Sequence, residues 1–343
     1  MLKQNTHKSI ILWLLTGCFL IYLMVVIGGI TRLTHSGLSM VEWNMIVGSM
    51  PPMSDVDWQI PFEKYKQSPE YQLINNQFSL DEFKSIYWWE YIHRLLGRTI
   101  GLVFIVPFFY FLIRKRFDKS LLKKMVVLLA LGAFQGFLGW FMVKSGLQKE
   151  PHVSHYRLAA HLISAFTVFG FTFWYALDLI YPVKNDLNEE LKLLVKKSKI
   201  MFGLIVAQII YGGFVAGLKA GLFYNTFPAM GEEYFPDTIL SHDSFASNML
   251  ENPAGVQFVH RYLAMIVFAY VLYVWINARS KALTILQTKA VNFMAIVVVA
   301  QFVLGILTLL YAVPVSLGVL HQTGAFFLFA ASLFFMHALK KNA

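Results

Sequence analysis

Long apolar stretches recur along the whole chain and are separated by short polar stretches. Each is close to the roughly 20 residues that an α-helix needs to cross a bilayer. None shows the alternation of apolar and polar residues that is typical of a strand. The pattern therefore predicts an all-α integral membrane protein with eight transmembrane helices, at about residues 10–30, 88–113, 124–143, 157–181, 200–219, 256–277, 290–312 and 317–338.

The composition agrees with a lipid environment. Hydrophobic residues make up 57% of the chain and charged residues only 14%, whereas soluble domains are about a quarter charged. The net charge of +10 would suit a nucleic-acid partner, but the basic residues lie in short runs between the apolar stretches, as in cytoplasmic loops. We therefore expect contact with membrane lipid and no nucleic acid.

The basic runs also predict the orientation. Arg114-Lys115-Arg116 and Lys196-Lys197 lie on one side of the predicted spans, and the acidic loop 31–87 lies on the other. The positive side faces the cytoplasm, so both termini should be cytoplasmic. Because the first apolar stretch is too long for a signal peptide and no transit peptide is evident, we expect a multi-pass protein of the bacterial inner membrane. Within loop 31–87, residues 61–65 could form an amphipathic helix or a simple solvated connection.

Several motifs occur twice at similar spacing. The pairs are Gly28-Gly29 with Gly212-Gly213, His93-Arg94 with His260-Arg261, Gln135 with Gln301, and His161 with His321. An even number of spans in each repeat gives two halves with the same orientation. We therefore predict two pseudo-symmetric four-helix bundles, formed by residues 1–183 and 199–343 and joined by a cytoplasmic linker at 184–198.

Four of the ten histidines lie just inside the outer ends of the even-numbered spans, namely His93, His161, His260 and His321. Ionisable residues inside a membrane are costly and are usually functional. A single one could simply be hydrogen-bonded across helices, but four repeat-equivalent ones weaken that interpretation. Two histidines per bundle suit the two axial ligands of a heme. Zinc usually takes three or four ligands, copper stays open on histidine count alone, and the bulky apolar surroundings favour heme.

The two predicted heme sites differ in one nearby residue. Glu90 lies three positions before His93 and hence on the same helix face, whereas the repeat partner of Glu90 is Gln257. This difference suggests that the first site performs chemistry, because a partly desolvated carboxylate can transfer protons or stabilise a cation. The second site would then hold a redox heme. The structural alternative is that Glu90 pairs with Arg94 or Arg98.

Basic residues near the predicted sites are candidates for binding the heme propionates. Arginine can pair with a carboxylate through two hydrogen bonds, and the alternative role is contact with lipid headgroups. The candidates are Arg32, Arg94, Arg98, Arg157 and Arg261.

These residues resemble the heme A synthase family over nearly the whole chain. The matching motifs are Gly29-Ile30-Thr31-Arg32-Leu33-Thr34, Ser36-Gly37-Leu38-Ser39, Trp43, Pro51-Pro52, Glu90-Tyr91-Ile92-His93-Arg94-Leu95, Gln135-Gly136, Gly139-Trp140, His161, His260-Arg261 and His321-Gln322-Thr323-Gly324. Some members carry a cysteine pair in an outer loop. This chain has only Cys18 and resembles the cysteine-free branch typical of Gram-negative bacteria and mitochondria.

The resemblance implies oxidation of the C8 methyl group of heme O to a formyl group, which gives heme A for terminal cytochrome oxidases. His93 and His161 would then bracket the iron of the substrate heme, with Glu90 as the catalytic residue. His260 and His321 would ligate the iron of a resident heme b. The implied partners are the farnesyltransferase that makes heme O, an electron donor that the sequence does not name, and a second copy in a homo-oligomer.

Two other functions account for some of these features. A di-heme cytochrome b-type electron carrier would use all four histidines but would give Glu90 no role. A heme transporter or chaperone would bind heme without changing it.

Overall fold

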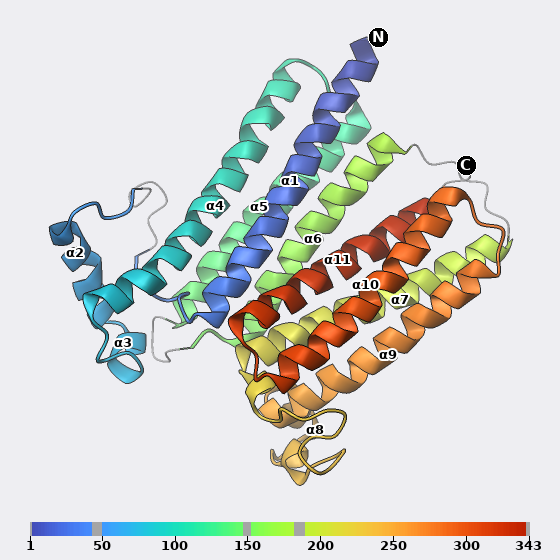
Figure 1. Cartoon of the computed structure of the whole chain (residues 1–343). Coiled ribbons are helices and arrows are strands. Elements are labelled where there is room, and N and C mark those ends of the chain that lie inside the picture. The colour runs from blue at the N-terminus through green and yellow to red at the C-terminus, as the bar shows by residue number, and fades with distance from the viewer. Residues whose placement is uncertain (1, 43–49, 147–151, 182–188, 341–343) are drawn as a thin grey trace. The chain divides into compact units, whose positions relative to one another are not determined.

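The computed structural model describes residues 2–42, 50–146, 152–181 and 189–340 (Figure 1). Trp43 and residues 184–188 of the predicted linker lie outside these ranges. Eight helices in the described ranges are long and apolar enough to cross a membrane. They are α1 (Leu2–Leu33), α4 (Leu80–Ile113), α5 (Lys119–Gly146), α6 (His155–Ile180), α7 (Glu189–Gly217), α9 (Pro253–Arg279), α10 (Ile285–Leu310) and α11 (Val315–Leu339).

The predicted fold class is therefore confirmed. Each of the eight predicted spans falls on one of these helices, and the chain is a multi-pass membrane protein. The extended structure found among the described residues is one isolated β-bridge between Met230 and Glu233.

All eight long helices begin before their predicted spans, and α4 and α7 are examples. The first turn of α4 is capped by Ser79, whose hydroxyl accepts from the backbone N–H of Glu82 while the Glu82 side chain accepts from the backbone N–H of Ser79. This reciprocal cap starts the helix outside the apolar stretch, and α4 reaches about 50 Å. Similarly, α7 begins at Glu189, so residues 189–198 of the predicted linker are helical.

The outer loop 31–87 contains two short helices, α2 (Asp55–Lys66) and α3 (Pro69–Leu73). Of the two alternatives left open for residues 61–65, the structure contains the helix, as part of α2. Trp58 and Phe62 of α2 pack on the outer part of α4, with ring centroids 5.0 Å from Tyr87 and 5.1 Å from Phe83, respectively. This buried aromatic cluster holds the loop on the helix that carries Glu90 and His93.

The second outer loop, 220–255, is also folded. It contains η1 (Ala220–Leu222), η2 (Asp237–Leu240) and α8 (Phe245–Leu250). The buried Asn252 side chain donates to the backbone oxygens of Thr238 and Ile239, and it caps the start of α9 by accepting from the N–H of Ala254. These hydrogen bonds attach the loop to the outer end of the helix that carries His260.

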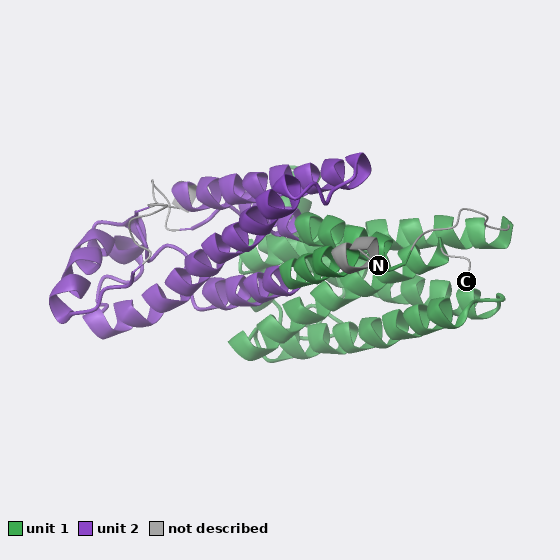
Figure 2. Ribbon diagram, turned by 90° about the horizontal axis from the view of Figure 1, so that it is seen from above, with its two compact units in different colours: residues 1–18, 166–343 green, residues 19–165 purple. Residues whose placement is uncertain are grey.

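The chain divides into two compact units, residues 1–18 with 166–343 and residues 19–165 (Figure 2). In the first unit, α7, α9, α10 and α11 contact one another in a closed order, α7 to α9 to α10 to α11 and back to α7. In the second unit, α4 packs on α5 and on α2. These units follow compactness rather than the sequence repeat, so the predicted halves 1–183 and 199–343 and their pseudo-symmetry stay a prediction.

Candidate functional site

Each of the four intramembrane histidines lies against a glycine of a neighbouring helix. A Cβ atom added to that glycine would lie 2.9–3.4 Å from the nearest ring atom of the histidine. The pairs are His93 with Gly28, His161 with Gly139, His260 with Gly212, and His321 with Gly305. At Gly305, Gly139 and Gly28 a side chain would crowd the ring, so glycine lets the imidazole lie close to the adjacent backbone, whereas a Cβ atom at Gly212 would make an ordinary contact.

The second pair of histidines has the spacing of two ligands to one metal. The ring centroids of His260 and His321 are 6.5 Å apart and their planes are nearly perpendicular, at 86°. Metal–imidazole bonds are about 2 Å long, so one ion between two rings separates the ring centres by about 6 Å. In the other unit, His93 lies within electrostatic range of His161.

Glutamine side chains lie beside two of the histidines. Nε2 of Gln208 is 3.1 Å from Nδ1 of His260 and donates to the backbone oxygen of that histidine at 3.0 Å. Gln135 relates to His161 in the same way, at 3.3 and 3.2 Å. The Oε1 atoms of both glutamines are buried and without a hydrogen-bond partner. A histidine that ligates a metal through one ring nitrogen carries a proton on the other and needs an acceptor there, which a turn of either amide would provide.

These features fit a heme. Among the described residues, no group of three or more His, Cys, Asp or Glu side chains could hold a metal ion. A histidine pair is sufficient for heme because the porphyrin supplies the remaining ligands. A turned glutamine amide would present its unpartnered oxygen to the ring, in exchange for the hydrogen bond that its nitrogen donates to the histidine backbone oxygen.

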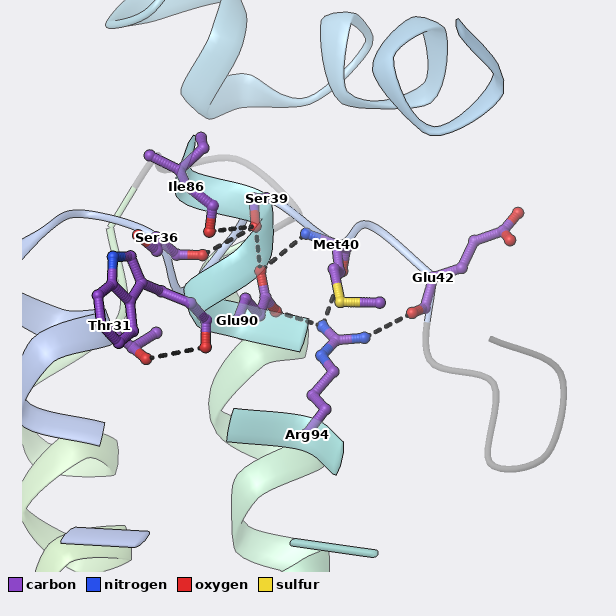
Figure 3. Close-up of polar contacts among 9 residues, drawn as sticks. Thr31, Ser36, Ser39, Met40, Glu42, Ile86, Glu90 and Arg94 are labelled. Atoms are coloured by element: carbon purple, nitrogen blue, oxygen red, sulfur yellow. Dashed lines mark hydrogen bonds and ion pairs between the residues drawn. The ribbon is translucent and has the colours of Figure 1, made fainter. Parts of the chain in front are cut away.

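Glu90 lies on α4 with its side chain almost fully buried, at 2% exposure. One carboxylate oxygen accepts from the Ser39 hydroxyl at 2.7 Å and from the Met40 backbone N–H at 2.8 Å (Figure 3). The other oxygen accepts from the Arg94 guanidinium. Of the two pairings expected as the structural alternative, the structure therefore contains Glu90 with Arg94.

Arg94 extends this contact to the segment that follows α1. Its guanidinium donates to the backbone oxygens of Met40 and Glu42, both at 2.7 Å (Figure 3). Glu90 and Arg94 together hold residues 39–42 against α4. The hydrogen bonds of Glu90 could not be found from the sequence, because Ser39 and Met40 are about 50 positions away.

In the other unit, the repeat-equivalent residues Gln257 and Arg261 likewise hold a loop segment by hydrogen bonds. Gln257 donates to the backbone oxygen of Tyr224 at 3.1 Å. Arg261, which is 6% exposed, donates to the backbone oxygens of Tyr224, Thr226 and Ala229. A Glu or Gln followed four positions later by Arg thus holds the segment that leaves the preceding long helix. The difference is that Arg94 meets a carboxylate, whereas the described partners of Arg261 are carbonyl oxygens.

The other arginines have varied surroundings. Arg32, in the last turn of α1, interacts electrostatically with Glu70 of α3. Arg157 donates to the backbone oxygen of Phe141 at 3.1 Å, and its guanidinium lies 3.9 Å from the centroid of the Phe141 ring. Arg98 is half-buried on α4, one turn beyond Arg94. Binding of heme propionates stays a prediction for all five arginines.

Sequence reasoning missed Gln208 altogether. Its contact with His260 joins residues 52 positions apart. The available signal was its place in the repeat. Gln208 comes four residues before Gly212-Gly213, and Met24 comes four residues before Gly28-Gly29.

Comparisons with known proteins agree with the resemblance seen in the sequence. A model of the cytochrome oxidase assembly protein family (COX15-CtaA) matches residues 11–333. Heme A synthase of Flavobacterium johnsoniae is 50% identical over 99% of this chain and 100% of that protein. Heme A synthases of Flavobacterium psychrophilum and Nitrosospira multiformis are 49% and 46% identical over 98% and 99% of this chain, and over 100% and 96% of their own lengths. The chain therefore belongs to the cytochrome oxidase assembly protein family, among relatives that are named heme A synthase.

Proposed function

We propose that this protein is a heme A synthase, an oxidoreductase that converts the C8 methyl group of heme O to a formyl group. The observation that carries the proposal is the set of four histidines, each against a glycine, in a chain up to 50% identical to proteins of that name. The conversion replaces two hydrogens of a methyl group by one oxygen and removes four electrons. Its product, heme A, would serve terminal cytochrome oxidases.

The two histidine pairs have separate tasks in this proposal. His93 and His161 bracket the iron of heme O, the substrate. His260 and His321 ligate the iron of heme b, the resident cofactor. When bound, heme b supplies electron transfer. The 6.5 Å between the rings of His260 and His321 supports their role as two ligands of one iron.

Glu90 is the catalytic candidate in the first site. It lies one turn before His93 on the same face of α4. Three hydrogen bonds hold its carboxylate in place, so it presents a fixed negative charge. Such a preorganised charge stabilises positive charge that develops in a reaction. Arg94 restrains the carboxylate, and Gln257 has no charge to offer at the corresponding place in the second site.

The proposal also includes a location and partners. The expected location is a bacterial inner membrane, and the basic runs favour both termini in the cytoplasm and both heme sites toward the outer side. Heme O would come from the farnesyltransferase that makes it, through the lipid phase. Dioxygen would be the oxidant, and the electron donor would supply the further electrons that reduce it to water. A homo-oligomer is a further expectation.

Co-expression with a heme O synthase, in a host that makes no heme A, tests the proposal. Hemes extracted from the membranes are separated and identified by mass. We expect heme A with the wild-type chain. If the protein binds heme b and the heme O of the membranes stays unchanged, the result would instead indicate a di-heme electron carrier. If the protein binds heme O and leaves it unchanged, the result would indicate a transporter.

Variants of Glu90 test its role in the same assay. Glu90→Gln keeps the size of the side chain and removes its charge, and it copies the Gln257–Arg261 arrangement. We expect it to bind both hemes and to lower heme A formation by about 100-fold or more. Wild-type yields of heme A from both Glu90→Gln and Glu90→Ala would show that Glu90 is not catalytic.

A further inference from the structure

The two sites differ at the residue four positions before the glycine that contacts the first histidine of each pair. In α7 this residue is Gln208, followed by Gly212, which lies against His260. In α1 it is Met24, followed by Gly28, which lies against His93. Met24 and Gln208 are therefore repeat equivalents on equivalent helices.

The surroundings of Met24 are adapted to a methionine. A Cβ atom added to Gly97 would lie 3.0 Å from the methyl carbon of Met24. Gly97 comes four residues after His93, and its repeat equivalent, four residues after His260, is Ala264. The first site thus keeps space for the methyl end of Met24, whereas the second site has an alanine beside a glutamine.

The consequence concerns the hydrogen bonds of the histidines. The amide nitrogen of Gln208 lies 3.1 Å from Nδ1 and 3.4 Å from Nε2 of His260, and it donates to the backbone oxygen of that histidine. A thioether offers no donor and only a weak acceptor. Met24 therefore cannot provide to His93 the amide group that Gln208 places beside His260.

Glutamines also occupy the corresponding positions near the other two histidines, although the buried Nδ1 of His321 has no hydrogen-bond partner among the described residues. Gln135 contacts His161. Gln301 takes the corresponding position on α10, where Gly324 leaves room for its side-chain oxygen one turn beyond His321. Among the four histidines, His93 is therefore the one whose surroundings have a methionine in place of a glutamine.

We propose that Met24 and Gln208 determine which heme exchanges and which heme stays. This inference rests on the proposed assignment of substrate and resident heme. A hydrogen bond to the outer nitrogen of a ligating histidine fixes the orientation of its ring and changes metal affinity by about 10- to 100-fold. Without that hydrogen bond, His93 releases iron more readily, so that substrate enters and product leaves. With it, His260 keeps the resident heme in place.

Exchange of the two side chains tests this proposal, because Met and Gln have nearly the same size. The probe is heme b, loaded into both sites of the full-length protein in detergent. Its transfer to an excess of apomyoglobin is followed by absorbance. We expect two phases in the wild type, with the faster phase absent in His93→Ala. Met24→Gln should slow the faster phase by about 10- to 100-fold, and Gln208→Met should accelerate the slower phase by a similar factor.

Met24→Leu is the matched control, since it keeps an apolar side chain and should leave both phases unchanged. Electron paramagnetic resonance of the first heme should also change in Met24→Gln and not in Met24→Leu, because the hydrogen bond alters the ligand. If Gln208→Met does not fold, Met24→Gln alone decides. Equal release rates for Met24→Gln and Met24→Leu would overturn the proposal.

This measurement is independent of catalysis. If the rates change as expected but no heme A forms in the co-expression assay, the proposed function fails while the role of these two residues stands. If heme A forms but the rates of Met24→Gln and Met24→Leu agree, the proposed function stands and this inference fails.

Discussion

The Ser39 hydroxyl donates a 2.7 Å hydrogen bond to the Glu90 carboxylate across 51 positions of the chain. Both side chains are buried, at 1% and 2% exposure. The contact attaches the segment that leaves α1 to α4, one turn before His93. The position of this histidine, and the charge beside it, therefore depend on a residue of the outer loop.

Loss of the Ser39 hydroxyl should weaken this attachment. A hydrogen bond to a charged group contributes about 1.5–3 kcal/mol, so Ser39→Ala should lower the apparent melting temperature of the detergent-solubilised protein by several degrees. Ser85→Ala is the control, because Ser85 is exposed on the same helix and its hydroxyl, among the described residues, donates to the backbone oxygen of Glu82. Similar melting temperatures for the two variants would contradict the structural importance of Ser39.

The protein should not tolerate even a conservative replacement of Arg261. Its guanidinium reaches three backbone oxygens of loop 220–255 at once, and the single ammonium of lysine cannot reproduce that fork. We expect Arg261→Lys to destabilise the protein by about 2 kcal/mol and to expose the loop to proteolysis. Limited proteolysis with mapping of the cleavage sites measures this effect. Wild-type resistance in Arg261→Lys would show that charge alone holds the loop.

The glycines beside the histidines should not tolerate a methyl group. In Gly305→Ala the new Cβ atom would lie 2.9 Å from Cε1 of His321, and relief of such overpacking costs about 1–3 kcal/mol. We expect a lower heme content per protein, measured by pyridine hemochrome spectra. Gly203→Ala is the control, since nothing lies within 4 Å of the added atom and alanine favours a helix. An equal heme content in both variants would argue against a close fit at Gly305.

The sequence allowed the spans and the histidines to be predicted because both depend on local features. Apolar length determines where a helix crosses a bilayer, and the spacing of His93 and His260 within the repeat is visible without a structure. The early start of α4 was also open to prediction, since Ser79 and Glu82 have the spacing of a capping box. The helix in loop 31–87 was one of two alternatives. Its apolar face is buried against α4 rather than in lipid, and the sequence does not reveal that contact.

The polar contacts of the sites could not be predicted in the same way. The pairs Ser39 with Glu90 and Gln208 with His260 join distant segments, and no periodicity reports such contacts. The Glu90–Arg94 pair lies within one helix turn and was foreseen as an alternative to catalysis. Its presence is compatible with a fixed catalytic charge.

The central claim is that each histidine pair holds one heme and that only the first pair serves the substrate. The heme content of purified wild-type protein, His161→Ala and His321→Ala, each co-expressed with a heme O synthase, tests it most directly. We predict heme b together with heme O or heme A in the wild type, and heme b without heme A in His161→Ala. His321→Ala should lose heme b. Heme A at wild-type levels in His161→Ala, or a wild-type protein without any heme, would contradict the account.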